Sequence, residues 1–588
     1  MRRTFVPFYS VLLAGICSAQ LTLDQKLLDF QTLAAVYAKN YAPYEWKLQT
    51  QGFDLLDIRP WLDQVRQTKT DLEFYDVMFQ YVARLNDAHV VFELPSDFGA
   101  VLGFGVGLYD GKALIEGINR TLLPTNVYSF ATGDEIVSLD GISSEELIQK
   151  FTPYNISANT RSTRAFAATM ITSRHQMLYP RAHEIGDSAT VVIRRSDGNL
   201  ATYTIPWVKT GTPLLQEGPV PSPRGNRRAA RAERNPGDPS SEAYMEPLSA
   251  LQWLGLPASR NMSDSEALVG FGSRGPYYAL PAGFVTRAGT KPTDFFFSGT
   301  FQAGGLNLGL IRFPNFDPFD PGTAVQQFEA EIRFMQANTD GLIIDDTRNP
   351  GGGVCYTQAL LARLIPTRFR TTGSEIRATA HQIAGFSSAL TAARSGGAPQ
   401  WVIDLYTALL DAVKTAYAEN RGLTGPLAVC APNTLDIDPA TDSNGNVIAY
   451  NKPLLVLVDE LSTSAAEIFA AVIQDNGRGP LFGMRTMGAG GSFNRDFDST
   501  IYSEGVSTVT QSLTTRRMPI VTTDFPTAPY IENIGVRPEI PYDYMTKENL
   551  VNSGRAFVQA FTQAMVDHVR AARDSNGSCD SCRHTAAR

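Results

Sequence analysis

Three hydroxyl side chains stand together where one apolar segment ends and a second, periodic one begins. Residues 453–458 are almost entirely apolar, Ser462, Thr463 and Ser464 follow, and residues 464–475 have helical spacing. A serine at the start of a helix lies beside N–H groups that have no acceptor within the helix, and beside the positive end of the helix dipole. Both features would stabilise the oxyanion formed when a serine attacks a carbonyl. The alternative is that one of these hydroxyls only caps the helix.

A glycine-rich loop offers a second chemical element. Residues 345–353 follow the predicted buried strand 341–344 and end in Gly351, Gly352 and Gly353. Such folds place their ligands at the carboxyl ends of their strands, and consecutive glycines let bare N–H groups approach a substrate. The competing use is phosphate binding, but the loop lacks the GxxxxGK[ST] pattern and no lysine follows it closely. The loop therefore favours an oxyanion-binding role.

Together these segments resemble the S41 family of serine peptidases, the C-terminal or tail-specific processing proteases. The shared motifs are Asn-Pro-Gly-Gly at 349–352, Ser-x-Ser-Ala-x-Glu-Ile-Phe at 462–469 and Gln-Asp-x-Gly-Arg at 474–478. The resemblance implies a ClpP/crotonase-like α/β core that hydrolyses peptide bonds.

The family pattern implies roles for individual residues. Ser464 would be the nucleophile, and the N–H groups of Ala465 and of Gly351 or Gly352 would form the oxyanion hole. Most members carry a general-base lysine at the position that is Ala489 in this chain. Either the chain is inactive or another residue supplies the base.

One branch of the family, that of the chlamydial protease-like activity factor, uses histidine and glutamate instead. The chain is similar to this branch at residues 485–491 and 531–536. The similarity implies that His89 is the general base and that Glu532 orients it. His89 would take the proton of Ser464 during attack and return it to the leaving amine. A histidine with an ordinary pKa would suit activity near or above about pH 6.5.

The rest of the chain must bring these distant residues together. Residues 23–94 have helical spacing, and residues 103–151 contain glycine-opened strands and a tight Asp-Gly turn that resemble a PDZ-like domain. Beyond residue 300, buried strands alternate with helices, which indicates an α/β core with parallel pairing. The expected fold class is thus α/β, an S41 peptidase core with an N-terminal helical region and an inserted PDZ-like β-rich domain. The expected segments are a signal peptide (1–19), the helical region (20–98), the PDZ-like domain (99–210), a flexible Pro/Arg-rich linker (211–260), the catalytic core (261–545) and a C-terminal helix with a Cys-containing tail (546–588).

Composition and the N-terminal residues indicate where the protein acts. The 588 residues are 43% hydrophobic and carry a net charge of −8, which excludes a disordered chain and disfavours nucleic-acid binding. Six histidines and five cysteines leave few ligands for soft metals, and we expect no metal and no cofactor. A basic start, an apolar run over 5–16 and small residues before a cut after Ala19 are typical of a secretory signal peptide. The run is too short to span a membrane, so we expect a secreted protein without a membrane span.

Secretion would allow three kinds of covalent change: disulfide formation, cleavage of the linker and glycosylation. Pairs Cys355–Cys430 and Cys579–Cys582 are plausible disulfides, although the sequence does not fix the pairing. The segment 211–250 is rich in proline and arginine, and we expect it to be a loop that is nicked during maturation rather than a site for anionic surfaces. The expected glycosylation sites are Asn119, Asn155, Asn261 and Asn576.

Three functions compete. The favoured hypothesis is a secreted serine endopeptidase that acts on polypeptides through a Ser-His-Glu triad, and the resemblance suggests a possible homodimer. The first alternative is a catalytically inactive, peptidase-like protein that binds peptides. The second is a processing peptidase for precursor peptides in a fungal natural-product pathway.

Overall fold

The computed structural model describes residues 20–585, apart from residues 95, 155–156, 216–268, 433 and 504. The side chains of residues 493–498 and 575–585 also lie outside the description. The expected signal peptide, most of the expected linker, the sequons at Asn155 and Asn261, and the Cys579 and Cys582 side chains are therefore outside the described residues.

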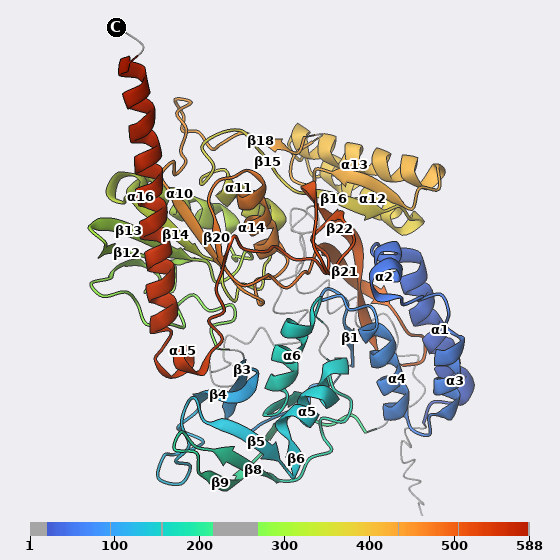
Figure 1. Ribbon diagram of the computed structural model, residues 1–588. Helices are drawn as coiled ribbons and strands as arrows, with labels where there is room; N and C mark the ends of the chain where they lie inside the picture. Colours follow the sequence, from blue (N-terminus) through green and yellow to red (C-terminus); the bar gives the residue numbers. More distant parts are fainter. Residues whose placement is uncertain are drawn as a thin grey trace, which may run out of the picture.

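A seven-stranded sheet forms the centre of the catalytic core (Figure 1). In spatial order its strands are β11 (Val285–Ala288), β12 (Phe297–Ala303), β13 (Leu306–Arg312), β14 (Gly341–Asp345), β19 (Leu454–Val458), β20 (Leu481–Gly483) and β24 (Ile540–Pro541). Neighbours from β13 to β24 are parallel, whereas β11, β12 and β13 are antiparallel. This mixed sheet confirms the predicted α/β core.

Helices cover both faces of this sheet. One face packs against α10 (Pro321–Asn338), α11 (Val354–Leu361) and α14 (Ala465–Asp475), and the other against α16 (Arg555–Thr585), which α15 (Lys547–Val551) precedes. Leu342 and Ile344 point into the first layer, and Ile343 between them points into the second. Because both faces are buried, β14 and β19 have the continuous apolar sequences from which they were predicted.

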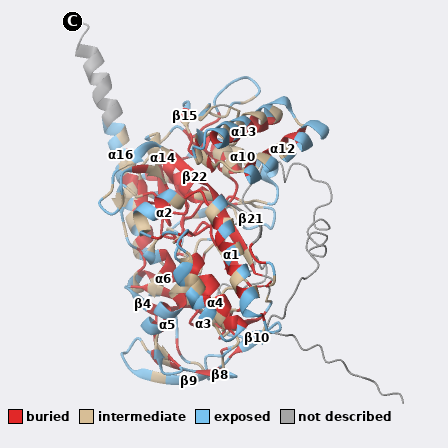
Figure 2. Ribbon diagram, turned by 90° about the vertical axis from the view of Figure 1, so that its right-hand side faces the viewer, coloured by how far each residue is buried: buried red, intermediate tan, exposed pale blue. Residues whose placement is uncertain are grey.

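The N-terminal helices pack on a second, six-stranded sheet. The helices are α1 (Leu23–Asn40), α2 (Tyr44–Gln51), α3 (Arg59–Gln67) and α4 (Asp71–Ala83). The sheet is built around the long strand β22 (Val506–Ile520), with β1 (Phe92–Glu93), β16 (Gly373–Arg377), β17 (Leu423–Leu427), β21 (Gly491–Asp498) and β23 (Ala528–Tyr530). Phe30, Tyr37 and Tyr81 are fully buried in the helical core, and Figure 2 shows how buried residues run from these helices into β22.

The PDZ-like region is a separate β-rich unit below the core in Figure 1. Its main sheet contains β3 (Phe104–Tyr109), β4 (Lys112–Ile118), β5 (Glu135–Leu139), β6 (Ile142–Ser143), β8 (Ser188–Arg194) and β9 (Leu200–Pro206). Its helices are α5 (Ser144–Phe151), the 3₁₀ turn η1 (Thr152–Tyr154) and α6 (Thr160–Thr169), and a small sheet pairs β2 (Gly99–Val101) with β7 (Ser173–His175) and β10 (Val208–Thr210). Asp140 and Gly141, with φ of 51° and 81°, form the predicted tight turn between β5 and β6.

A helical hairpin beside the second sheet was not anticipated. It consists of α12 (Ala380–Ser395) and α13 (Gln400–Ala418), and the short strands β15 (Phe369–Arg370) and β18 (Asp436–Ile437) pair nearby. A disulfide joins Cys355 on α11 to Cys430, one of the two pairings considered. Within the described residues, no helix has both the length and the hydropathy needed to cross a bilayer.

Candidate active site

Ser464 lies at the turn between β19 and α14, in a backbone conformation that side chains rarely adopt. Its φ is 57° and its ψ is −117°, and it is the N-cap of α14. The Ser464 Oγ is 3.1 Å from His89 Nε2. Ser462 instead donates to the carbonyl of Asp346 at 2.8 Å. Ser464 is therefore both the helix cap and the hydroxyl that faces an imidazole.

His89 reaches the serine because its loop is fastened to β22. The Thr508 hydroxyl donates to the carbonyl of His89 at 2.7 Å and accepts from the N–H of Val91, also at 2.7 Å. Immediately afterwards Phe92 pairs with Ser507 as β1 joins β22. A strand from the C-terminal third of the chain thus fixes the loop that carries the predicted base.

The surroundings of His89 hold its imidazole neutral at physiological pH. The residue is fully buried, and burial lowers its pKa to about 4. The nearby Asp87 carboxylate acts in the opposite direction, and the Lys47 ammonium lowers the pKa further. Asp87 also accepts a hydrogen bond from the His89 backbone N–H at 2.8 Å. A neutral imidazole at hydrogen-bonding distance can accept the serine proton.

The glycine loop lies directly against Ser464. A Cβ added to Gly351, whose φ is 88°, would lie 2.8 Å from Ser464 Cβ and 2.9 Å from Ala465 N. The Gly351 N–H already donates to Asn349 Oδ1 at 2.9 Å. Within the described part of the chain, the N–H groups of Gly352 and Ala465 have no such acceptor. Of the expected oxyanion donors, Ala465 and Gly352 are therefore the two whose N–H groups are not already used within the described residues.

Glu467, one turn into α14, organises the backbone around Ser464. Its fully buried carboxylate accepts from Ser464 N at 3.1 Å, from the Thr486 hydroxyl at 2.6 Å and from the N–H groups of Gly488 and Ala489 at 2.6 Å. Burial raises the pKa of Glu467 to about 7 against the lowering effect of these donors. The position of the family's lysine thus carries an alanine whose backbone binds Glu467.

Glu532 belongs to a buried charge cluster beside the site. Its Oε1 accepts from Lys47 Nζ at 2.5 Å, and its Oε2 accepts from Gly490 N at 2.9 Å. Burial and Asp87 raise the pKa of Glu532, whereas Lys47 lowers it. The structure therefore brings Glu532 to the pair of groups whose charges act on His89, and its role in orienting the imidazole stays a prediction.

Comparison with known proteins identifies the domain that carries this geometry. Residues 307–541 match the family model described as Peptidase family S41. The chain carries a serine peptidase domain of family S41. Residues 98–213 match a PDZ domain, which confirms the PDZ-like region of this S41 protein.

Individual relatives agree with this assignment. A protein of Chlamydia pneumoniae is 24% identical over 594 residues, which cover 92% of this chain and 90% of the relative. The carboxyl-terminal-processing peptidase 3 of Arabidopsis thaliana, a chloroplastic protein, is 32% identical over 151 residues, 24% of this chain and 26% of the relative. The crystal structure of mature CPAF has a TM-score of 0.71 at 21% identity, with 93% of this chain and 98% of that chain covered. This S41 peptidase therefore shares its overall fold with mature CPAF.

Three charged residues of the site were missed from the sequence. Glu467 had a signal, because Ser464 and Glu467 have the spacing of a capping box. Asp87 lies two residues before His89, a spacing that has no chemical meaning until the loop is folded. Lys47 lies in the short helix α2, and nothing in its surrounding sequence distinguishes it from a surface lysine.

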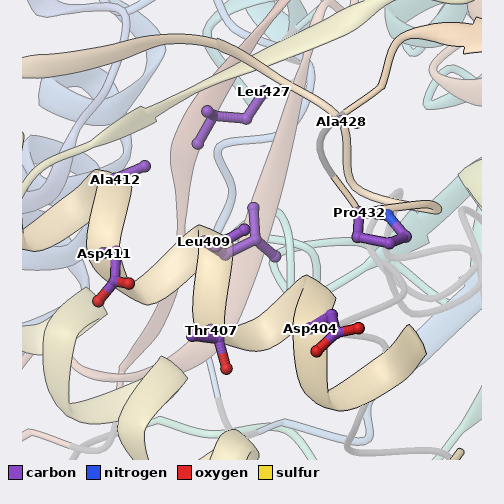
Figure 3. A pocket seen from close by; sticks show the side chains of 9 residues that line it. Asp404, Thr407, Leu409, Asp411, Ala412, Leu427, Ala428 and Pro432 are labelled. Atoms are coloured by element: carbon purple, nitrogen blue, oxygen red, sulfur yellow. The ribbon is translucent and has the colours of Figure 1, made fainter. Parts of the chain in front are cut away.

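The helical hairpin carries a cavity apart from the Ser464 site. A cavity of about 630 Å³ lies between α13 and the segment after β17, and no residue of the Ser464 site lines it (Figure 3). Its lining residues are Asp404, Thr407, Ala408, Leu409, Asp411, Ala412, Leu427, Ala428 and Pro432. In the described ranges, His, Cys, Asp and Glu form no group of three that could hold a metal ion.

Proposed function

We propose that this S41 protein is a secreted endopeptidase that cleaves polypeptides through an acyl-enzyme on Ser464. The observation that carries the proposal is the 3.1 Å distance from Ser464 Oγ to His89 Nε2. A hydroxyl and a buried neutral imidazole at this distance are the nucleophile and base that acyl transfer needs.

The reaction follows from this arrangement. His89 takes the hydroxyl proton as Ser464 Oγ attacks the scissile carbonyl carbon, and the N–H groups of Ala465 and Gly352 stabilise the oxyanion. The imidazolium gives its proton to the leaving amine as the C–N bond breaks. A water molecule then attacks the ester, His89 takes a proton from it, and Ser464 leaves with that proton.

Glu532 completes the proposed triad. Its carboxylate, held by Lys47 and Gly490, would orient His89 and stabilise the imidazolium that forms during attack. Asp87 supports the same state, because its negative charge raises the pKa of His89.

A fluorophosphonate probe tests the proposal. The wild-type protein should be labelled, Ser464→Ala should not be labelled, and His89→Gln should be labelled much more slowly. Ser395→Ala, at an exposed serine of α12, is the matched control and should be labelled like the wild type. An unlabelled wild type would refute the proposal and favour an inactive peptide-binding protein, whereas equal labelling of Ser464→Ala would refute Ser464 as the nucleophile.

Secretion is part of the proposal and is supported by the Cys355–Cys430 disulfide, since such bonds persist in oxidising compartments. The sequon at Asn119 follows β4 in a partly exposed turn, where a glycan has room. Mass spectrometry of protein from culture medium should find a chain that begins after Ala19 and carries a glycan on Asn119. Intact residues 1–19 in that material would contradict secretion through a cleaved signal. The same material, examined by light scattering, tests the proposed homodimer.

A further inference from the structure

We propose that Lys47 is a positioning residue of the peptidase, which fastens the His89 loop and Glu532 to each other from the N-terminal helix α2. The inference rests on the proposed function, because it assigns a role toward the same His89 and Ser464.

The Lys47 ammonium is fully buried and fully committed. Its Nζ donates to Glu532 Oε1 at 2.5 Å, to Asn533 Oδ1 at 2.7 Å and to the Asn86 carbonyl at 2.8 Å. An ammonium has three N–H donors, so these acceptors use all of them. The three acceptor oxygens come from two other segments and together form a site that fits one ammonium group. Lys47 therefore differs from a lysine whose side chain only covers apolar surface.

The three acceptors belong to the two segments that the proposed triad needs. Asn86 lies three residues before His89 and has a φ of 47°, so its carbonyl is part of the tight loop that presents the imidazole. Asn533 Nδ2 donates to the same carbonyl at 2.9 Å, and the neighbouring Trp46 Nε1 donates to the Glu532 carbonyl at 3.1 Å. Helix α2 therefore contacts both segments, and the Lys47 ammonium donates hydrogen bonds to each.

Lys47 also acts on His89 by charge. The charged groups around the His89 imidazole are Asp87 and Lys47, and Glu532 interacts with both of them. The Tyr41 hydroxyl donates to Asp87 Oδ2 at 2.9 Å. Lys47 lowers the pKa of His89, so replacing its charge with a neutral side chain should raise that pKa. A merely structural lysine would not shift the pH dependence of catalysis.

The test is the pH profile of kcat and KM for Lys47→Met on a fluorogenic peptide. We expect kcat to fall by about tenfold with KM nearly unchanged, because the base is misplaced rather than the substrate site lost. We also expect the acid limb of kcat/KM to move up by about half a pH unit or more. Lys47→Arg keeps the charge and should keep the limb at its wild-type position. Lys39→Met, at an exposed lysine of α1, should match the wild type throughout.

Three controls keep the outcome decisive. Folded Lys47→Met with wild-type kcat and an unmoved limb would overturn the inference. If this variant does not fold, Lys47→Met/Glu532→Gln removes both members of the buried ion pair. Its kcat should still be lower than that of Glu532→Gln alone, and equal kcat values would overturn the inference. A wild type that the fluorophosphonate probe does not label would refute the proposed function, whereas a labelled wild type with unaffected Lys47→Met would refute only this inference.

Discussion

The depressed pKa of His89 predicts a peptidase that works in acid. A group with a pKa of about 4 is about 97% neutral at pH 5.5. A histidine with the ordinary pKa of about 6.5 would be about 9% neutral at the same pH. If His89 alone sets the acid limb, kcat/KM at pH 5.5 should therefore stay near its full value, whereas an exposed histidine in its place would lower it roughly tenfold. The lowered pKa of His89 thus extends the sequence-based expectation of activity near or above about pH 6.5 to more acidic pH.

The assay measures kcat/KM between about pH 4.5 and 9 on a fluorogenic peptide without titratable groups. The lowest pH of this range is set by the stability of the folded protein. Between pH 6.5 and 4 the unfolded state binds more protons at His89 than the folded state does, so stability falls as the pH decreases. The loss reaches about 3 kcal/mol across the whole window. Circular dichroism at each pH separates this unfolding from titration of the active enzyme.

Two other buried carboxyls could produce an acid limb. Burial raises the pKa of Glu467 and of Glu532, so each could titrate above His89. Glu467→Gln removes the first of these carboxyls and Glu532→Gln removes the second. An acid limb of kcat/KM that persists in both variants therefore belongs to His89. Half-maximal kcat/KM at pH 6.5 or above in both folded variants would refute the reasoning from burial.

The remaining predictions concern the backbone around Ser464 and the disulfide. Gly351→Ala should abolish probe labelling and lower the free energy of unfolding by about 1–3 kcal/mol, because the residue has a φ of 88° and its Cβ would meet Thr463 O at 2.5 Å. Gly385→Ala, where nothing lies within 4 Å, is its control, and equal urea midpoints would contradict this prediction. Glu467→Gln should cost about 1–3 kcal/mol, since an amide NH₂ would face N–H donors, and urea unfolding measures it. Loss of the disulfide in Cys355→Ser/Cys430→Ser should cost about 4 kcal/mol, the chain entropy of a 75-residue loop, and an unchanged urea midpoint would argue against it.

The catalytic core was predictable because its signals are local. Strands buried on both faces have continuous apolar sequences, and β14 and β19 were recognised in this way. The loops at their carboxyl ends then place Ser464 and Gly351 at one edge of the sheet by topology alone. The Asp140-Gly141 turn has the same local character, since two positive φ values select these residue types.

The charge cluster was not predictable for the opposite reason. Lys47, Asp87 and Glu532 become neighbours only through packing of α2, the His89 loop and the segment after β23. The local patterns of a single sequence do not show which distant residues will pack together. The hairpin α12–α13 was missed because its sequence carries no chemical motif, and its first helix is alanine-rich and only weakly amphipathic. The shifted pKa of His89 likewise depends on burial that only the folded chain reveals.

Because the site is divided between distant segments, the order in which the chain is synthesised determines when all of its residues are first present. Ser464 follows His89 by 375 residues. At about 5–20 residues per second, a ribosome needs roughly 20 to 75 seconds to cover that distance. Helix α16, which covers one face of the central sheet, is made later still. If Ser464 and His89 act as proposed, a nascent chain carries its base for most of its synthesis without a nucleophile, and its own peptidase activity cannot begin before residue 464 has been made.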